Sequence, residues 1–470
     1  MAGRIVFDIS SLARWSGPSV GIVRVERELA LWARKHDPGA VFVFFDPIAQ
    51  AFRPIRPRWL DEILEGRAIV QTWGLPDPVP GRMRGIDRVP GPLMAPARWL
   101  LQFRRQLMML LERRRLAANR PWVARAAEKA QALLMTARYR WQMMRADGTR
   151  RSIIPYEWAL GEVLEPGRGD LLVNAGFAWS HTNVAAVAAQ KLRMGFRYVI
   201  FCYDIIPLLF PNYYQPHDVE QFRAHYHVAF PTADLVVFSA RKIEADARDY
   251  CAGHGLAIGE TRIVPLGADS VAPGGGAQAP LPAGVEAGRY ALFVSTIEPR
   301  KGHRLLYEVW LRLLAEGVPQ THSFKLVFVG RPGWLIADLI EKLERDPRLQ
   351  GTIIVLPGVD DRQLAALYAG AAFCLYPSAY EGYGLPIIEA FSHGKAVLAS
   401  TGGAIPEVVG EFSPCLDSAD AELWHATLKR WIADPGARAP YEDAIRKRFR
   451  HPNWDEAAAG FFREIETARR

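Results

Sequence analysis

Short apolar runs rich in β-branched residues alternate with helical patterns along most of this 470-residue chain. In the first half the expected strands lie near residues 4–8, 41–45, 170–174, 197–203, 234–239 and 261–265. In the second half they lie near residues 290–295, 324–329, 352–356, 372–376, 396–399 and 413–416. This alternation predicts repeated βα units, and hence an α/β fold of doubly wound parallel sheets.

The chain is too long for one ordinary core, so two domains of roughly 200 residues each are expected. A Pro/Gly-rich stretch without periodicity suggests a linker at residues 271–284. The expected domains are then residues 1–270 and 285–450, with 451–470 as a helix packing back toward the first domain. In doubly wound sheets, ligands bind at the carboxyl ends of the strands.

A glycine-rich turn before an expected helix sets two carboxylates eight positions apart, at Glu381 and Glu389. Pro386 suits the first helical position, and this would place Glu389 in the first turn. Gly382 and Gly384 allow bare backbone to approach a ligand, and a helix N-terminus favours an anion such as phosphate. Carboxylates beside a phosphate suggest acceptors for hydroxyl groups, as in a nucleotide-sugar pocket. The alternative is a structural helix with two favourably placed glutamates.

The positive charge of the chain is concentrated in one segment. The net charge is +8, but residues 81–160 hold seventeen Arg and Lys against five Asp and Glu, so this segment alone carries +12. We therefore expect a basic, helical insertion at about residues 82–155 of the first domain.

Residues 98–118 form the clearest amphipathic pattern of that segment. Its apolar side chains fall on one arc of roughly 120° at helical spacing, and they are Trp99, Leu100, Phe103, Leu107, Leu110 and Leu111. A basic amphipathic helix can lie in an anionic membrane interface, or it can pack its apolar arc on the protein body. Both interpretations remain open. Nucleic-acid binding is less favoured, because no recognised motif accompanies the charge.

Four blocks in the C-terminal half carry a resemblance to a known family. They are Val294–Gly302, Leu326–Gly330, Leu356–Asp360 and Tyr376–Glu389, with fainter blocks at Phe201–Pro207, Ala233–Ser239 and Val264–Gly267. Together they resemble glycosyltransferase family 4, the glycosyl transferases group 1, and its mannosyltransferase-like branch. The resemblance implies the GT-B fold, two Rossmann-like domains, and a retaining transfer.

The resemblance also implies roles for particular residues. Glu381 would contact the donor sugar, Glu389 would hold the ribose hydroxyls, and Lys301 would neutralise the diphosphate. Many relatives carry an arginine where Thr296 stands here, and Arg300 is the expected substitute. A leaving nucleoside diphosphate gathers negative charge, so cations at this place have a physical reason as well.

Further residues are implied on the acceptor side and around the phosphates. Asp204 is the candidate for orienting the acceptor hydroxyl, since Tyr203 replaces the histidine of many relatives; an ordinary strand-ending aspartate is the alternative. A glycine loop at residues 17–21 would bring Gly21 and Arg24 to the donor phosphates. Other expected donor contacts are Gly382, Tyr383, Gly384, Leu385 and Val359.

No metal site is expected. Asp360 and Asp361 begin an expected helix, where capping explains them, and the eleven histidines form no ligand-like cluster. Four scattered cysteines and the lack of an apolar stretch near the ~20 residues that span a bilayer favour a cytoplasmic protein. A peripheral position at the inner face of the plasma membrane remains open.

The sequence thus predicts a retaining, metal-independent hexosyltransferase that needs no cofactor. Its expected donor is a nucleotide sugar, with GDP-mannose favoured, and its expected acceptor is a glycan or polyprenyl-linked glycan of a surface polysaccharide such as lipopolysaccharide. Two alternatives remain. A nucleotide-sugar epimerase of the same fold would turn over the donor without an acceptor, and a catalytically silent, membrane-associated glycan-binding scaffold would show no turnover.

Overall fold

The computed structural model describes residues 3–17, 21–72, 151–268 and 279–467. The chain divides into two compact units. One comprises Met1–Ile200 and Ala224–Ala233, and the other comprises Phe201–Arg223 and Asp234–Ala468. This division differs from the expected one, because segments on the N-terminal side of residue 270 join the second unit. The domain limits expected from the sequence stay a prediction.

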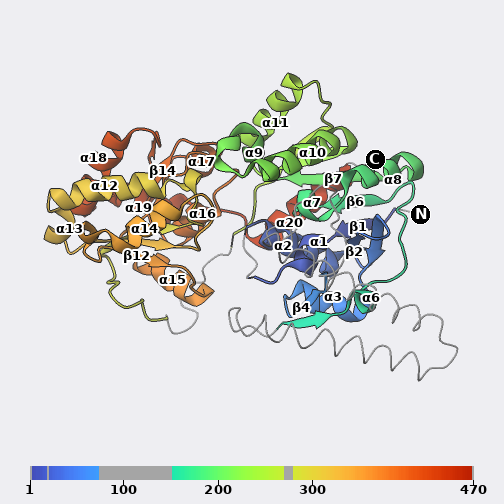
Figure 1. Cartoon of the computed structure of the whole chain (residues 1–470), viewed down its shortest axis with the longest axis horizontal. Helices are drawn as coiled ribbons and strands as arrows, with labels where there is room; N and C mark the ends of the chain where they lie inside the picture. The colour runs from blue at the N-terminus through green and yellow to red at the C-terminus, as the bar shows by residue number, and fades with distance from the viewer. Residues whose placement is uncertain (1–2, 18–20, 73–150, 269–278, 468–470) are drawn as a thin grey trace, which may run out of the picture. The chain divides into compact units, whose positions relative to one another are not determined.

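Seven strands form the first sheet, in the order β3-β2-β1-β6-β7-β8-β9. They are β1 (Ile5–Asp8), β2 (Val41–Asp46), β3 (Ala51–Pro54), β6 (Leu171–Asn174), β7 (Arg197–Cys202), β8 (Leu235–Phe238) and β9 (Glu260–Ile263). Figure 1 labels four of them, β1, β2, β6 and β7. β1 pairs in parallel with β2 and β6, whereas β3 runs antiparallel to β2. The parallel strands match the expected ones.

Helices connect these strands, as the alternating pattern predicts. They are α1 (Ser10–Arg14), α2 (Ile22–His36), α3 (Pro57–Leu64), α6 (Tyr156–Ala159), α7 (Ala178–His181), α8 (Val184–Met194), α9 (Ile206–Leu209), α10 (Pro216–Thr232) and α11 (Arg241–Gly253). A small parallel pair joins β4 (Ala68–Val70) to β5 (Ser152–Ile154). β3, β4 and β5 were not expected, because runs of three or four residues are too short to show a period.

Six parallel strands form the second sheet, in the order β12-β11-β10-β13-β14-β15. They are β10 (Tyr290–Val294), β11 (Lys325–Val329), β12 (Ile353–Leu356), β13 (Phe373–Tyr376), β14 (Val397–Ser400) and β15 (Cys415–Leu416). The strands are almost wholly apolar, because a parallel sheet covered by helices is buried on both faces. All six were expected from the sequence.

The connections of the second sheet reverse direction between β10 and β13. From β10 the chain moves outward to β11 and β12, and then returns to β13 on the other side of β10, where Leu292 lies opposite Cys374. This reversal creates a topological switch point, where the loops that follow β10 and β13 diverge and leave room for a ligand.

Helices of the second half are α12 (His303–Ala315), α13 (Val318–Thr321), α14 (Ala337–Arg345), α15 (Asp361–Gly370), α16 (Leu385–Ser392), α17 (Ile405–Val409), α18 (Ala421–Ala433), α19 (Ala439–Arg448) and α20 (Trp454–Thr467). Trp310 of α12 and Trp424 of α18 are the largest fully buried side chains. They fill the core under the sheet, and this packing fixes the position of the loops at its edge.

The last helix, α20, packs on strands of the first sheet. The rings of Phe201 and Phe461 stack with centroids 5.9 Å apart. Arg262 Nε lies 3.1 Å from Glu464 Oε2. α20 therefore returns to residues that precede β10 in the sequence.

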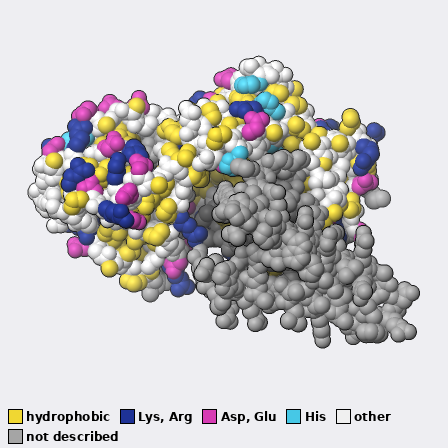
Figure 2. All heavy atoms as spheres, viewed as in Figure 1, with side chains coloured by type: hydrophobic (Ala, Val, Ile, Leu, Met, Phe, Trp, Pro, Cys, Tyr) yellow, Lys and Arg dark blue, Asp and Glu magenta, His cyan; other side chains and the backbone are white. Residues whose placement is uncertain are grey.

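Acidic and basic side chains alternate over the part of the second unit seen in Figure 2. Several belong to surface ion pairs, such as Arg304 with Asp338 at 2.6 Å and Arg312 with Glu422 at 2.7 Å. Exposed pairs of this kind contribute little to stability.

Several expectations fall on residues outside the described ranges. They concern the amphipathic helix at 98–118, most of the insertion at 82–155, residues 18–20 of the glycine loop, and most of the linker. At the end of the expected insertion, Ser152–Ile154 form strand β5 and no helix. Within the described ranges, no helix combines the length and the apolar character that crossing a membrane requires.

Candidate functional site

Two loops at the switch point carry the predicted donor residues, and they touch each other. Lys301 ends a 3-10 turn (Pro299–Lys301) after β10, and Glu381 follows β13. Between them, Gly302 has a φ of 84°, and a Cβ there would lie 2.5 Å from the carbonyl oxygen of Pro377. Ala379 N donates to Arg300 O at 2.7 Å. The two loops are therefore held together by backbone contact.

Glu381 lies between the two predicted cations. Lys301 Nζ donates to Glu381 Oε1 at 2.6 Å, and Arg300 Nη1 lies 2.9 Å from Glu381 Oε2. Arg300 Nη2 also contacts Glu298 Oε1 at 3.0 Å. Glu381 is only 6% exposed, so this is a buried cluster of alternating charges.

The charges of the cluster set its protonation state. Burial alone would raise the pKa of Glu381, but Arg300 and Lys301 together lower it to about 2. Burial lowers the pKa of the Lys301 ammonium, and the neighbouring guanidinium acts in the same direction, whereas Glu381 opposes both. Glu381 is therefore a carboxylate at neutral pH, able to accept hydrogen bonds.

Arg300 and Lys301 differ in how many of their N–H donors are already bound by acceptors of the protein. Arg300 uses Nη1 for the carbonyl oxygen of Tyr380 at 2.7 Å and for Glu381, and it uses Nη2 for Glu298. An ammonium has three N–H donors, and Glu381 takes one of those on Lys301. Arg300 Nε is buried without a hydrogen-bond partner among the described residues, so both cations keep an unused N–H group, although the ammonium of Lys301 keeps two.

The residues that follow β7 lie against this loop. A Cβ on Gly382 would be 2.4 Å from the carbonyl oxygen of Tyr203 and 2.9 Å from Asp204 Cβ. Ser239 Oγ donates to Gly382 O at 3.2 Å. Burial raises the pKa of Asp204, although the charge of Arg300 opposes this. The structure therefore brings Asp204 to the Glu381 cluster, and its expected role toward an acceptor stays a prediction.

The start of α16 corrects two details of the prediction. The helix begins at Leu385, so Pro386 is its second residue and not its first. Glu389 is the fifth, and the first turn holds no acidic residue. Gly384 precedes the helix with a φ of 114°, a conformation that side chains disfavour, and its carbonyl oxygen accepts the first bond of the turn. This glycine, rather than the proline, sets where the helix starts.

Glu389 is half-buried, and its carboxylate contacts Tyr368. Tyr368 OH donates to Glu389 Oε2 at 2.8 Å. The buried Tyr376 lies close enough to both Glu381 and Glu389 that, after burial, their negative charges help to raise its pKa. The charges of both predicted glutamates thus act on Tyr376, one from the loop and the other from the second turn of the helix.

The other predicted site residues lie in varied places. Tyr383 and Leu385 are half-buried beside Gly384. Val359 lies between β12 and α15, half-buried against the core. Gly21 and Arg24 lie in the first unit at the start of α2, where Gly21 has a φ of 53°. The roles expected for these residues toward a donor stay predictions.

Sequence reasoning missed Glu298, Tyr368 and Tyr376 as members of the site. Glu298 stands two positions before Arg300 in the same block, so an acidic residue close to a predicted cation was an available signal. Tyr376 ends β13 and read only as an apolar strand residue. Tyr368 lies on α15, and nothing in the sequence connects it to Glu389.

The capping interpretation of Asp360 is confirmed. Its Oδ1 accepts from the Gln363 backbone N–H at 2.7 Å, at the start of α15. In the part of the chain that the structure describes, no three His, Cys, Asp or Glu side chains gather where they could hold a metal ion.

Part of the chain matches a known protein family. Residues 284–448 match the protein family described as glycosyl transferases group 1. The second unit contains a glycosyl transferases group 1 domain. This domain holds the switch point, the Glu381 cluster and α16.

Related proteins include mannosyltransferases. The chain is 38% identical over 149 residues to the O-antigen chain mannosyltransferase B of Escherichia coli, covering 32% of this chain and 38% of that protein. It is 29% identical over 163 residues to the serotype-specific mannosyltransferase WbdA of Escherichia coli, covering 35% of this chain and 19% of that protein. The similarity thus spans well under half of either relative. Among solved structures, sucrose-phosphate synthase from Thermosynechococcus elongatus superposes with a TM-score of 0.48 at 21% identity, covering 64% of this chain and 74% of that one.

Proposed function

We propose that this protein is a retaining glycosyltransferase that moves a mannose-like hexose from a nucleotide sugar, with GDP-mannose the favoured donor. The acceptor is a glycan or a polyprenyl-linked glycan in surface polysaccharide assembly. The observation that supports this most is Glu381, held as a carboxylate between Arg300 and Lys301 at the switch point. The mannosyltransferase names of the two relatives support the choice of sugar.

In this proposal the cation and the carboxylate of the cluster have different roles in the transfer. The bond from the anomeric carbon to the donor phosphate breaks, and a bond to the acceptor oxygen forms on the same face. The acceptor proton passes to the departing phosphate oxygen. N–H groups of Lys301 stabilise the negative charge that grows on the diphosphate, and Glu381 accepts from a sugar hydroxyl.

Asp204 and Glu389 complete the proposed site. Asp204 lies beside Gly382 and orients the acceptor hydroxyl. Glu389, aligned by Tyr368, accepts from the ribose hydroxyls. No protein group is required as a nucleophile in this scheme, and no metal ion is invoked. These roles follow from the family resemblance and fit the positions of the side chains.

Membrane association belongs to the same proposal. Residues 98–118 combine clustered arginines with an apolar arc, and each basic residue near an anionic leaflet adds about 1 kcal/mol to binding. A peripheral position at the inner face of the plasma membrane would bring the enzyme to a lipid-linked acceptor.

A panel of nucleotide sugars tests the proposal directly. The purified full chain is incubated with GDP-mannose, UDP-glucose or UDP-N-acetylglucosamine and with mannose-containing acceptors, and the products are analysed by NMR. We expect transfer from GDP-mannose with an α-linked product. A β-linked product would contradict retention, transfer from a UDP-sugar alone would contradict the donor, and conversion of the donor without an acceptor would favour an epimerase.

A further inference from the structure

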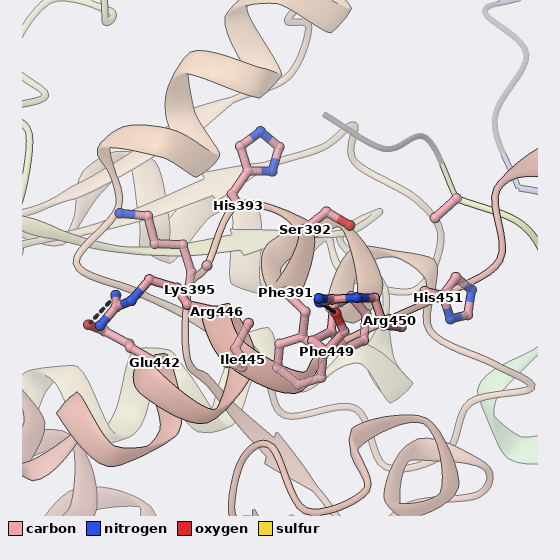
Figure 3. Close-up of a pocket in the computed structure, with 12 residues that line it drawn as sticks. Phe391, Ser392, His393, Lys395, Glu442, Ile445, Arg446, Phe449, Arg450 and His451 are labelled. Carbon is pink, nitrogen blue, oxygen red and sulfur yellow. Dashed lines mark hydrogen bonds and ion pairs between the residues drawn. The ribbon is translucent and has the colours of Figure 1, made fainter. Parts of the chain in front are cut away.

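The loop that carries Glu381, residues 380–384, continues at its C-terminal end into the well-packed helix α16. Ile387 and Phe391 of this helix are buried. In the pocket wall shown in Figure 3, the ring of Phe391 meets the ring of Phe449 edge to face, with centroids 5.1 Å apart. α16 is thus fixed by its apolar side chains. The position of Glu381 then depends on what holds the other end of the loop.

Tyr380 forms that end, and both its carbonyl oxygen and its hydroxyl are bound. The carbonyl oxygen accepts from Arg300 Nη1 at 2.7 Å, and the hydroxyl donates to Asp246 Oδ2 on α11. Tyr380 is 6% exposed, and its ring lies 5.1 Å from the ring of Phe210. A Cβ on Gly403 would lie 2.8 Å from Cε1 of the same ring. The surrounding contacts therefore keep the hydroxyl directed at Asp246.

Asp246 is itself held in place on α11. Its other oxygen, Oδ1, accepts from Lys242 Nζ at 2.5 Å, one helical turn earlier. Only 13% of its side-chain surface is exposed. Ile243 and Ala247 on the same helix are buried, so packing fixes the helix that carries this carboxylate. A hydrogen bond to an ionised acceptor is also stronger than one between neutral groups.

A second connection joins the start of α11 to the same loop. Glu407 on α17 accepts through Oε1 and Oε2 from the backbone N–H groups of Arg241 and Lys242, both at 3.2 Å. Ala404, just before α17, donates from its backbone N to Glu381 O at 2.9 Å. All of these residues belong to the second unit. The backbone of Glu381 and the first turn of α11 are therefore connected through α17 as well.

We propose that Asp246 is a positioning residue for Glu381 and acts through the hydroxyl of Tyr380. Arg300 and Lys301 set the charge and the orientation of the Glu381 carboxylate, whereas Asp246 fixes the backbone from which this carboxylate reaches the donor sugar. The inference rests on the proposed function, because the position of Glu381 matters for rate only if it contacts a reacting molecule. Misplacing such a group by roughly 1 Å can cost about 100-fold in rate.

Three variants test the contact. Tyr380→Phe removes the hydroxyl and keeps the ring, and Asp246→Ala removes the acceptor. Asp246→Asn keeps an acceptor oxygen for Tyr380, since the half-exposed Lys242 can turn away from the amide. Transfer from GDP-mannose by the purified full chain should show kcat lowered about tenfold or more in Tyr380→Phe and in Asp246→Ala. The KM for the donor should change little, and Asp246→Asn should restore most of kcat.

Controls separate positioning from folding, and melting temperatures verify that each variant is folded. Asp249→Ala removes an exposed carboxylate from the same helix and should leave kcat unchanged. The double variant Tyr380→Phe/Asp246→Ala should lose no more activity than the worse single variant, because both changes remove the same contact. Wild-type kcat in Tyr380→Phe, losses that multiply in the double variant, or no rescue by Asp246→Asn would each contradict the proposal.

Hydrogen exchange gives a readout that needs no turnover. The Ala404 amide donates to Glu381 O, so its exchange, followed by mass spectrometry of peptides that contain it, reports how firmly the loop is held. We expect faster exchange in Tyr380→Phe and Asp246→Ala, and wild-type exchange in Asp246→Asn and Asp249→Ala. If the wild type transferred no sugar, the proposed function would fail, yet faster exchange would still support the hold of Asp246 on the loop. Unchanged exchange in Tyr380→Phe would overturn that hold whatever the activity.

Discussion

Lys301 Nζ lies 2.6 Å from Glu381 Oε1, and the two residues come from loops eighty positions apart in the sequence. Both side chains are largely buried, with 13% and 7% of their side-chain surface exposed. Because Arg300 holds the other oxygen of the same carboxylate, Glu381 keeps one charge state and one orientation.

The first prediction concerns the pH dependence of stability. The pKa of Glu381 is lowered from 4.5 to about 2, and this corresponds to a contribution of about 3 kcal/mol to the folded state. A lowered carboxyl pKa stabilises the fold above pH 4.5, and the contribution is lost as pH falls toward 2. Glu381→Gln should therefore destabilise the protein at pH 7, and by less as pH falls from 5 to 3. Urea unfolding of both proteins measures the difference, and a constant difference over this range would argue against the ion pairs.

Asp204→Asn should behave in the opposite way. Burial raises the pKa of Asp204, so its ionised form is disfavoured in the folded state, and stability falls as pH rises through the unfolded and then the folded pKa. At pH 7 the neutral amide should leave the melting temperature unchanged or higher, since its oxygen can still accept from Ile206 N. We expect transfer activity to fall about 100-fold, as for misplacement of a reacting group. Full activity would remove Asp204 from the site.

Backbone contact between Gly382 and Tyr203 predicts a sharp steric effect. An added methyl group at Gly382 would meet the carbonyl oxygen of Tyr203 at 2.4 Å, so Gly382→Ala must displace the loop that carries Glu381. We expect a loss of about 1–3 kcal/mol in the free energy of unfolding, together with a loss of donor binding. Gly460→Ala is the control, because a Cβ there meets open space on α20 and should stabilise the helix by about 0.5–1 kcal/mol. Equal stability of the two variants would contradict the contact.

Strand positions could be predicted because their physical signals are local, and the residues of the Glu381 cluster were singled out by a family resemblance. Buried parallel strands appear as apolar runs, and Glu381, Arg300 and Lys301 lie in blocks of recognisable order. The start of α16 was misplaced by one residue because Pro386 is equally acceptable at the first or second helical position, whereas the positive φ of Gly384 decides it.

Other parts of the site depend on long-range contacts that a sequence does not display. Tyr368 of α15 reaches Glu389 on α16. Asp246 is an ordinary charged residue of a helical pattern until the fold places it against Tyr380. Such residues are identified from tertiary contacts in the structure, because no periodic pattern in the sequence marks them.

The basic segment of the sequence leads to a prediction about membrane binding. Deleting residues 82–150, which keeps β5 intact, should abolish pelleting of the protein with anionic vesicles. Vesicles of neutral lipid serve as the control, and added salt should weaken binding to the anionic ones. If the deleted protein pellets as well as the full chain, the basic segment does not carry membrane binding.

The most direct measurement compares GDP-mannose binding and transfer in the wild type, Lys301→Gln and Lys447→Gln. Lys301 is placed to stabilise charge on the diphosphate, and loss of one such donor typically costs about 100–1,000-fold in rate. We predict that Lys301→Gln folds but loses transfer by about this factor and binds GDP-mannose more weakly, whereas Lys447→Gln matches the wild type. Wild-type affinity and turnover in folded Lys301→Gln would contradict the assignment of this cluster as the donor site.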